Sequence, residues 1–381
     1  MRIVQVSPYF YPHVGGVESH VFDLSRELAS RGHRVCVLTT NMGKMPDREV
    51  MMGVEIIRLK PLSIVFRTPI VPRIRRYLSR AETDIVHSHS PPPLSSYYAV
   101  KGCKASNIPF VITYHCDVEI PSRMGKVVAE LYRRTFESYT VRNADKIIMT
   151  SGSYHATSRS VWKYHPEIIP NAVDADRFNP KIDGSAARER HGIGPEEIVV
   201  LFVGRIVWHK GIEYLMEASK YVKDAKFFIV GGGENLEKYR ARAKAIGVEK
   251  NVIFTGRLSW ADLPEYYAAC DIFVLPSISR LEAFGIATLE AMSTAKPAIV
   301  ADIPGVREVI EDGKEGLIFD VMDSEDLGKK ISTLVKNPGL RKRMGDAGRK
   351  KVEERFSIST VADQIEKVYE EAVSSSTTSK V

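Results

Sequence analysis

Hydrophobic and polar positions follow two spacings along the first half of the chain. Short apolar runs predict strands, and apolar residues three or four positions apart predict an amphipathic helix. Strands are predicted at 2–6, 35–39, 54–59, 85–87, 110–113 and 146–150, with a helix at 16–30. Strands separated by helices favour a parallel sheet with helices on both faces.

The second half repeats this alternation after a loop at 166–194 that contains three prolines. Strands are predicted at 198–203, 227–230, 252–255, 272–275 and 298–301, and a helix at 212–221. Most of these strands run into Gly, Pro or Ser loops, where open α/β sheets bind their ligands. The fold class is therefore α/β, with two doubly wound domains at 1–180 and 195–355. An amphipathic helix at 356–373 and a short polar tail at 374–381, expected to be disordered, complete the chain.

Size and composition agree with two folded domains. The 381 residues are 44% hydrophobic and 27% charged, as in globular proteins. The four cysteines are far apart, which favours free thiols and a reducing compartment. The N-terminus resembles a strand rather than a signal peptide, and no apolar run approaches the roughly 20 residues of a membrane span. We expect a cytoplasmic protein, with peripheral attachment to the inner face of the membrane as a further option.

The net charge of +7 is unevenly distributed. Up to Phe178 there are 24 Lys and Arg against 16 Asp and Glu, and beyond it 30 against 31. Five arginines stand among apolar residues between Arg67 and Arg80, and the segment from Arg123 to Arg142 adds five more cations. This pattern indicates contact with an anionic membrane surface, although a solvated charged face would look similar. Nucleic acid is the weaker partner, because no nucleic-acid module is present.

Two carboxylates, Glu282 and Glu290, flank the apolar sequence Ala-Phe-Gly-Ile-Ala-Thr-Leu. Carboxylates accept hydrogen bonds from sugar or ribose hydroxyls. The loop after the first strand of the second domain contains Gly204, Arg205 and Lys210, and both cations could reach a diphosphate. Together these residues favour a site for a polyhydroxylated, phosphorylated ligand over two solvated surface cations and two solvated glutamates.

Glycines mark two further loops. Gly15 and Gly16 separate the first strand from the first helix, so they either let a phosphate approach the helix N-terminus or simply form a tight turn. Gly231-Gly232-Gly233 follows another strand, and we retain Gly232 as a weaker ligand contact. Neither a Gly-x-Gly-x-x-Gly nor a P-loop pattern is present, which disfavours dinucleotide dehydrogenases and P-loop NTPases.

His115 ends a strand of the first domain. A histidine there could bind a sugar or stabilise a departing phosphate. His87, His89 and His155 compete for this role, and a structural histidine is the more common outcome.

Four motifs together resemble the family 4 retaining glycosyltransferases of the GT-B fold. They are Ser7-Pro-Tyr-Phe-Tyr-Pro-His-Val-Gly-Gly-Val-Glu18, Gly204-Arg205 with Lys210-Gly211, Ile169-Pro-Asn-Ala-Val-Asp174, and Glu282-x7-Glu290. The resemblance covers nearly the whole chain, and the order and spacing of all four motifs make it specific. It implies two Rossmann-like domains facing across a cleft, with the last helix crossing back to the first, acceptor-binding domain.

The resemblance also implies a nucleotide-diphospho-sugar donor and gives roles to residues. Arg205 and Lys210 would hold the diphosphate, Glu290 the ribose and Glu282 the donor sugar. Main-chain N–H groups at Phe284, Gly285 and Ile286 would face the sugar and phosphate, as would Gly15 and Gly16, and His115 would lie near the sugar. Arg257 and Leu258 would contact the base. No metal or other cofactor is obligatory, and Mg²⁺ is an option but not a requirement.

The sequences from Tyr11 to His20 and from Val86 to Ser90 also look like enzymes that transfer N-acetylglucosamine to phosphatidylinositol, and the chain is similar to phosphatidylinositol mannosyltransferase-like enzymes. This favours a UDP-sugar and a lipid-linked or inositol-containing acceptor. Ala172 departs from the Gly of many relatives, which Ala can replace where φ is negative.

Several alternatives remain open at the level of the sequence. Retention favours attack on the same face as the leaving phosphate, but Glu282 could instead act as a nucleophile in a double displacement. A GT-B-like sugar-nucleotide epimerase or phosphorylase is the enzymatic alternative. A non-catalytic protein that binds sugar nucleotides or anionic lipids is the alternative from another class.

Overall fold

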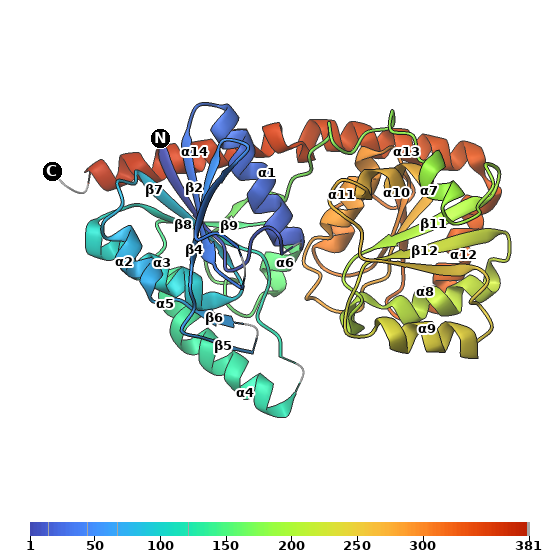
Figure 1. The fold of residues 1–381 in the computed structure, drawn as a ribbon, viewed down its shortest axis with the longest axis horizontal. Helices are drawn as coiled ribbons and strands as arrows, with labels where there is room; N and C mark the ends of the chain where they lie inside the picture. The colour runs from blue at the N-terminus through green and yellow to red at the C-terminus, as the bar shows by residue number, and fades with distance from the viewer. Residues whose placement is uncertain (14, 44, 67, 121, 379–381) are drawn as a thin grey trace. The chain divides into compact units, whose positions relative to one another are not determined.

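A computed structural model describes residues 1–378 apart from 14, 44, 67 and 121, and the chain forms two α/β units (Figure 1). The second unit is Ala172–Ser357, and the first comprises residues 1–171 with the C-terminal residues from Ile358 onward. The division lies before the segment 180–195 where the sequence suggested it. The reason is that Val173, Phe178 and Ile193 are buried in the core of the second unit.

The first unit is built on an eight-stranded sheet in the order β10-β9-β8-β7-β1-β2-β4-β3. Among the described strands of this sheet, the β3–β4 pair is antiparallel and the other pairs are parallel. The strands are β1 (Arg2–Val6), β2 (Arg34–Thr40), β3 (Arg48–Met51), β4 (Val54–Leu59), β7 (Ile85–Ser90), β8 (Phe110–Tyr114), β9 (Lys146–Met149) and β10 (Glu167–Ile168), with a separate hairpin of β5 (Ser63–Val65) and β6 (Thr68–Ile70). The predicted parallel sheet is thus present, with an antiparallel edge.

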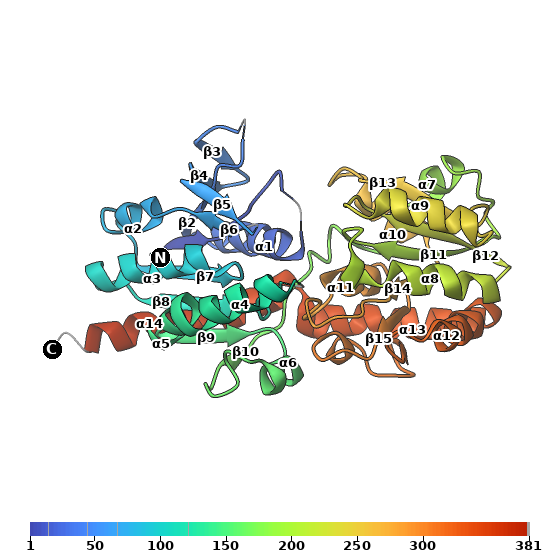
Figure 2. The same cartoon turned by 90° about the horizontal axis from the view of Figure 1, so that it is seen from below.

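Helices cover both faces of this sheet (Figures 1 and 2). Helices α1 (Gly16–Ser30) and α14 (Ile358–Thr378) pack together on one face. On the other face, α3 (Pro93–Ser106) packs against the strands and contacts α2 (Arg73–Leu78), the π-helical η1 (Arg133–Glu137) and α5 (Ser138–Arg142). Two further helices are α4 (Arg123–Tyr132) and α6 (Gly152–Thr157).

Helix α14 extends beyond its predicted end, so residues 374–378 are helical, where the sequence predicted a disordered tail. Its start is held to the residues that follow α1 by an ion pair of Arg31 and a hydrogen bond of His33. Arg31 Nη1 lies 2.6 Å from a carboxylate oxygen of Asp363, and His33 Nε2 lies 2.6 Å from a carboxylate oxygen of Glu366. Val361, Ile365, Val368 and Tyr369 are buried, and this apolar face anchors the polar C-terminal turns.

The second unit has a six-stranded parallel sheet in the order β13-β12-β11-β14-β15-β16. Its strands are β11 (Ile198–Val203), β12 (Ala225–Val230), β13 (Val252–Gly256), β14 (Ile272–Leu275), β15 (Ala298–Ala301) and β16 (Gly316–Phe319). Three strands, β11, β14 and β15, have the predicted bounds, because Gly or Pro and polar residues delimit their apolar runs.

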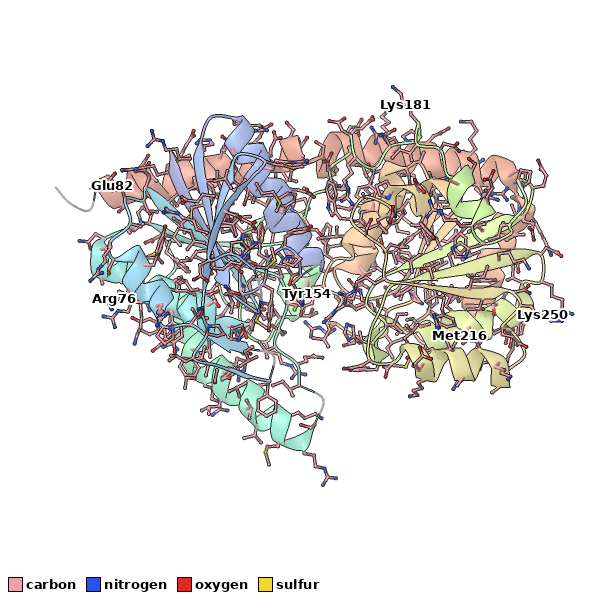
Figure 3. All side chains as sticks on the ribbon, viewed as in Figure 1. Arg76, Glu82, Tyr154, Lys181, Met216 and Lys250 are labelled. Carbon is pink, nitrogen blue, oxygen red and sulfur yellow. The ribbon has the colours of Figure 1, made fainter. Side chains whose placement is uncertain are left out.

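Helices again lie on two sides of the sheet (Figures 1 and 2). Helix α8 (Ile212–Ala218) contacts both α9 (Leu236–Ala245) and α12 (Ser324–Lys336). Helix α7 (Ser185–Glu189) contacts α10 (Leu263–Ala269), and helix α11 (Ile286–Ser293) contacts α13 (Pro338–Lys351). Short 3₁₀ turns η2 (Trp208–Lys210), η3 (Ser219–Tyr221) and η4 (Val306–Glu308) and the π-helical η5 (Val352–Phe356) complete the unit. Figure 3 shows the side chains on this frame, with Met216 of α8 turned into the packed interior, where it is fully buried.

Candidate functional site

The loops after β11 and β14 lie side by side at the point where the strand order of the second unit reverses. From β11 the chain continues to β12 on one side, while β14 pairs on the other. The main-chain N–H of Ile278 donates to the carbonyl of His209 at 2.9 Å. Gly211 has φ +63°, and a Cβ there would lie 1.9 Å from the carbonyl oxygen of Pro276. Only glycine permits this approach of the two loops.

Lys210 and Glu282 meet at this junction. Lys210 Nζ forms an ion pair with a carboxylate oxygen of Glu282. The same oxygen accepts a hydrogen bond from Ser277 Oγ at 3.0 Å. Burial tends to raise the pKa of Glu282, but the charge and hydrogen bond of Lys210 outweigh it and hold the pKa below its usual value of 4.5. Glu282 is therefore ionised at neutral pH.

Arg205 precedes Lys210 in the same loop, and its side chain is exposed. Within the described part of the chain it forms no ion pair with an acidic residue. Its guanidinium is thus available for an anionic ligand, whereas Lys210 already has a carboxylate partner. The sequence assigned both cations to a diphosphate, and the structure adds that Lys210 is paired with Glu282.

The triple glycine brings main-chain segments together. The N–H of Gly204 donates to Val230 at 3.0 Å, and that of Gly231 donates to Gly256 at 2.9 Å. A Cβ on Gly231 would lie 1.9 Å from the carbonyl oxygen of Gly204, and one on Gly233 would lie 2.3 Å from that of Ile206. These two glycines therefore serve loop packing.

Gly232 differs from its neighbours, because a Cβ there would lie 3.7 Å from the Cβ of Arg257, an ordinary contact. The side chain of Arg257 is exposed, while Leu258 is partly buried against the core. The structure thus brings Gly232 and Arg257 together and leaves the guanidinium accessible.

The apolar residues between the two glutamates are mostly core residues. Phe284 is buried, and its ring lies 6.1 Å from that of Phe356 in an edge-on arrangement. Gly285 precedes α11 with φ +83°, and a Cβ there would lie 2.6 Å from a methyl carbon of Leu275. Ile286 begins the helix. The Phe284 ring consequently belongs to the core, and only main-chain groups of this turn are candidates for ligand contact.

Glu290 lies on α11 with partners that sequence reasoning missed. Tyr267 Oη donates to a carboxylate oxygen of Glu290 at 2.5 Å. Burial raises the pKa of Glu290, against the opposing effects of this hydrogen bond and of the positive charge of Arg177. The cation is held by aromatic rings, 3.6 Å from the centroid of Trp260 and 4.5 Å from that of Phe178. No local motif marks these contacts, because they join residues far apart in sequence.

The remaining candidates belong to the first unit. Gly15 is the N-cap of α1 in an extended conformation, and Gly16 is its first residue. His115 follows β8 and is buried, with Nε2 3.1 Å from Nδ1 of His89. His155 is structural, because its Nε2 contacts the carbonyls of Val161 and Tyr164 at 3.1 and 3.0 Å.

Neither a metal cluster nor a membrane span is evident in the described parts of both units. Their His, Cys, Asp and Glu residues form no group of three or more arranged to hold a metal ion. None of their helices combines the length and hydropathy needed to cross a bilayer.

Two family descriptions match consecutive parts of the chain. "Glycosyltransferase Family 4" matches residues 14–177, and "Glycosyl transferases group 1" matches residues 184–351. The chain belongs to the family 4 glycosyltransferases. Its fold is that of the GT-B glycosyltransferases, with parallel sheets in two domains.

Two relatives of this glycosyltransferase are phosphatidylinositol mannosyltransferases. It is 28% identical to a phosphatidyl-myo-inositol mannosyltransferase of Mycobacterium leprae (strain TN), over 98% of each chain. It is also 28% identical to a GDP-mannose-dependent alpha-(1-6)-phosphatidylinositol monomannoside mannosyltransferase of Mycolicibacterium smegmatis, over 89% of this chain and 91% of the relative.

Solved structures share the fold over almost the entire glycosyltransferase. Sucrose-phosphate synthase from Thermosynechococcus elongatus superimposes with a TM-score of 0.84 at 23% identity, over 98% of this chain and 99% of that chain. The Anabaena protein HepE in complex with UDP-glucose gives 0.77 at 20% identity, over 97% and 100%.

Proposed function

We propose that this glycosyltransferase transfers a hexose or N-acetylhexosamine from a UDP-sugar to a hydroxyl acceptor with retention of configuration. The observation that carries the proposal is the Lys210–Glu282 pair at the strand-order reversal of the second unit, where open α/β sheets bind ligands. A cation and an ionised carboxylate in contact offer adjacent groups for a phosphate and for a sugar hydroxyl.

The second unit supplies groups suited to each part of the donor. Arg205 is exposed and binds the diphosphate together with Lys210. Glu282 accepts hydrogen bonds from the donor sugar, and Glu290 accepts them from the ribose hydroxyls. Arg257, with Leu258 and the open face of Gly232, contacts the base. The main-chain N–H groups of Phe284, Gly285 and Ile286 lie at the start of α11 and stabilise negative charge there.

We assign complementary roles in the first unit to the α1 N-terminus and to His115. Gly15 and Gly16 present the helix N–H groups to the diphosphate. His115 accepts a hydrogen bond from a hydroxyl of the donor sugar. No metal ion is required in this scheme.

In the proposed mechanism, the acceptor hydroxyl attacks the anomeric carbon on the face from which the diphosphate departs. Negative charge develops on the leaving phosphate, and Arg205 and Lys210 stabilise it as positioned cations. The departing phosphate oxygen accepts the acceptor's proton. Glu282 bonds to Lys210 and Ser277, and these bonds weaken it as a nucleophile.

Azide rescue distinguishes this mechanism from double displacement. When the Glu282→Gln variant reacts with the donor in the presence of azide, we expect no glycosyl azide of inverted configuration among the products. Formation of that product would identify Glu282 as a nucleophile and contradict same-face attack.

The transfer itself is tested by mixing the full-length protein with a UDP-sugar and candidate acceptors and measuring released UDP. We expect release that depends on the acceptor, with a phosphatidylinositol-containing or other lipid-linked alcohol as the first candidates because of the two mannosyltransferase relatives. An isomer of the donor formed without acceptor would identify an epimerase instead. Binding of the sugar nucleotide without release of the nucleoside diphosphate would indicate a non-catalytic protein. Release of GDP from GDP-mannose, with no release of UDP from any UDP-sugar, would show that the donor base is guanine and not uracil.

We further propose that the first unit contacts an anionic membrane surface through α4. Met124, Val127 and Leu131 are 74%, 69% and 58% exposed, and their spacing places them on one side of the helix. Arg123 and Lys126 are exposed around them. The combination of exposed apolar and basic side chains suits an anionic bilayer.

The other basic segment has a different character. In α2, Ile74 and Leu78 are buried, while Arg73, Arg75 and Arg76 are exposed; Figure 3 shows Arg76 pointing away from the fold. Arg67 lies outside the described residues. Within Arg73–Leu78, therefore, a membrane could contact the exposed arginines but not the buried apolar side chains that the sequence pattern had grouped with them.

A further inference from the structure

A continuous chain of polar side chains crosses the buried interior of the first unit. Gln5 of β1, His87 and His89 of β7, and Tyr369 of α14 are all completely buried, and His115 after β8 is 5% exposed. Sequence reasoning treated His87 and His89 as competitors of His115. The structure shows them as members of one hydrogen-bonded network.

One branch of the network leads from α14 to His115. Gln5 Nε2 donates to Tyr369 Oη at 2.9 Å. The other amide atom, Gln5 Oε1, lies 3.0 Å from His89 Nε2. His89 Nδ1 lies 3.1 Å from His115 Nε2. A second branch continues from Tyr369 Oη to His87 Nδ1 at 2.7 Å and from His87 Nε2 to Thr113 Oγ1 at 2.7 Å.

Burial keeps the histidines of the network neutral. It lowers the pKa of His87 to about 3 and the pKa values of His89 and His115 well below 6.5, and the neighbouring imidazoles lower them further. A neutral imidazole has one N–H donor and one bare acceptor nitrogen. Each hydrogen bond therefore determines the position of the next proton.

The orientation of the Gln5 amide determines which ring nitrogen of His89, and then of His115, carries the proton. Gln5 Oε1 can only accept, so His89 donates from Nε2 and its Nδ1 is bare. The bare Nδ1 of His89 must accept from His115, which places the proton of His115 on Nε2. Within the described part of the chain, His115 Nδ1 has no hydrogen-bond partner. That nitrogen is then a bare acceptor, suited to a ligand hydroxyl that donates.

We propose that Tyr369 and Gln5 are positioning residues that, through His89, select the tautomer of His115 in which Nδ1 accepts. The proposal rests on the role in sugar binding proposed above for His115. It gives the C-terminal helix a specific part in the reaction, since Tyr369 anchors the amide of Gln5 364 positions away in sequence. With the amide of Gln5 reversed, every proton in this branch would move and His115 Nδ1 would carry a hydrogen.

The tautomer can be read directly by ¹⁵N NMR of the full-length protein labelled in its histidine rings, with His115 assigned from a His115→Gln variant. We expect a protonated Nε2 and a bare Nδ1 in the unmodified protein. A protonated Nδ1 would overturn the proposal, and this measurement needs no variant of the network to fold.

Variants separate positioning from simple packing. Tyr369→Phe and Gln5→Met interrupt the branch to His115, and we expect mixed tautomers at His115 and a loss in kcat/KM of about tenfold, the scale of one hydrogen bond. Ser96→Ala is the matched control, because it removes a buried hydroxyl that bonds to Ser88 Oγ outside the network and should leave the His115 signals unchanged. Unchanged His115 signals in both test variants, or equal changes in all three, would contradict the proposal.

Failure of the positioning role and failure of the proposed glycosyl transfer give different results. A predicted tautomer together with an unchanged kcat/KM in His115→Gln would remove His115 from sugar binding and overturn the positioning role. Absence of transfer from every sugar nucleotide would overturn the proposed function, while the NMR result would still report the direction of the hydrogen bonds.

Discussion

Glu282 and Glu290 lie eight residues apart but in opposite electrostatic environments. Lys210 lowers the pKa of Glu282 despite burial, whereas burial raises the pKa of Glu290 despite Tyr267 and Arg177. The first is therefore a fixed anion, and the second takes up a proton at a higher pH than an ordinary glutamate does. This difference suits one carboxylate that faces a developing positive charge and another that binds neutral hydroxyls.

Replacing Lys210 tests the role of the ion pair. We expect Lys210→Ala to raise the donor KM and to lower kcat, since it removes a cation from the diphosphate and leaves Glu282 buried without its counterion. Steady-state kinetics are the measurement. Lys220→Ala, which removes a cation paired with Glu217 on the same unit, should behave like the unmodified enzyme. An unchanged kcat/KM in Lys210→Ala would exclude this residue from the diphosphate site.

The same variant has a predicted pH dependence. In the unmodified enzyme the pKa of Glu282 is below 4.5, so ionisation of this group limits activity only below that pH. Without Lys210, the largest opposition to burial is removed, leaving only the weaker effects of His209 and Ser277, and the pKa of Glu282 rises. The acid limb of the kcat/KM profile should therefore move to higher pH in Lys210→Ala. Superimposable acid limbs in the two enzymes would show that Lys210 does not control Glu282.

Glu137 provides a test of stability in the first unit. Burial raises its pKa above 4.5, against hydrogen bonds from Ser160 and from Tyr114, the latter at 2.8 Å. A raised folded-state pKa stabilises the fold at pH values below 4.5, and this contribution is lost as pH rises through the folded-state value. Urea unfolding of Glu137→Gln should thus show less loss of stability than the unmodified protein as pH rises above 4.5.

The control is Glu130→Gln. Hydrogen bonds from Arg133 and Arg134 lower the pKa of Glu130 to about 2, so its small contribution has the opposite sign and is lost as the pH falls. Parallel stability curves for the unmodified protein and Glu137→Gln would refute the assignment for Glu137.

Among the elements, apolar runs with clear ends were predicted well and buried polar runs poorly. Strand β14 has the predicted bounds because Pro276 follows it directly. Strand β7 continues three residues past its predicted end, through Ser88, His89 and Ser90. These polar residues are fully buried because partners on other elements satisfy them, such as Gln5 for His89. A pattern of hydrophobicity along the chain contains no information about such partners.

The exposed apolar side of α4 can be tested for membrane contact by substitution. Met124→Ser, Val127→Ser and Leu131→Ser together should reduce co-sedimentation with vesicles containing phosphatidylglycerol, since the exposed apolar area is removed. Charge reversal of Arg73, Arg75 and Arg76 to Glu should reduce it mainly at low salt.

The control for α4 is Val50→Ser with Met52→Ser, two side chains of the same unit that are 74% and 57% exposed. It should bind like the unmodified protein. Equal binding by all four proteins at low salt would eliminate the membrane contact.

For the whole molecule, the two-domain α/β organisation and the family were predictable because motifs and strand ends recur in a specific order. The loops of Lys210 and Glu282 were expected to lie together, since both follow strands of one parallel sheet. The partners of Glu290 were not, because Arg177 and Tyr267 reach it through tertiary packing. The compact units divide at 171/172, ahead of the segment 180–195 suggested by the sequence, because burial of Val173 and Phe178 in the second core depends on three-dimensional contacts.

The central claim is that the second unit binds a sugar nucleotide through Lys210 and Glu290, and ligand-dependent thermal unfolding tests it most directly. UDP-glucose, UDP-N-acetylglucosamine, GDP-mannose and ADP-glucose should each be added to the full-length protein, to Lys210→Ala and to Glu290→Gln. Ligand at one hundred times Kd stabilises a fold by about 2.7 kcal/mol. We predict that a UDP-sugar raises Tm by several degrees in the unmodified protein and by clearly less in both variants. No rise with any of the four ligands, or an equal rise in the variants, would contradict the account.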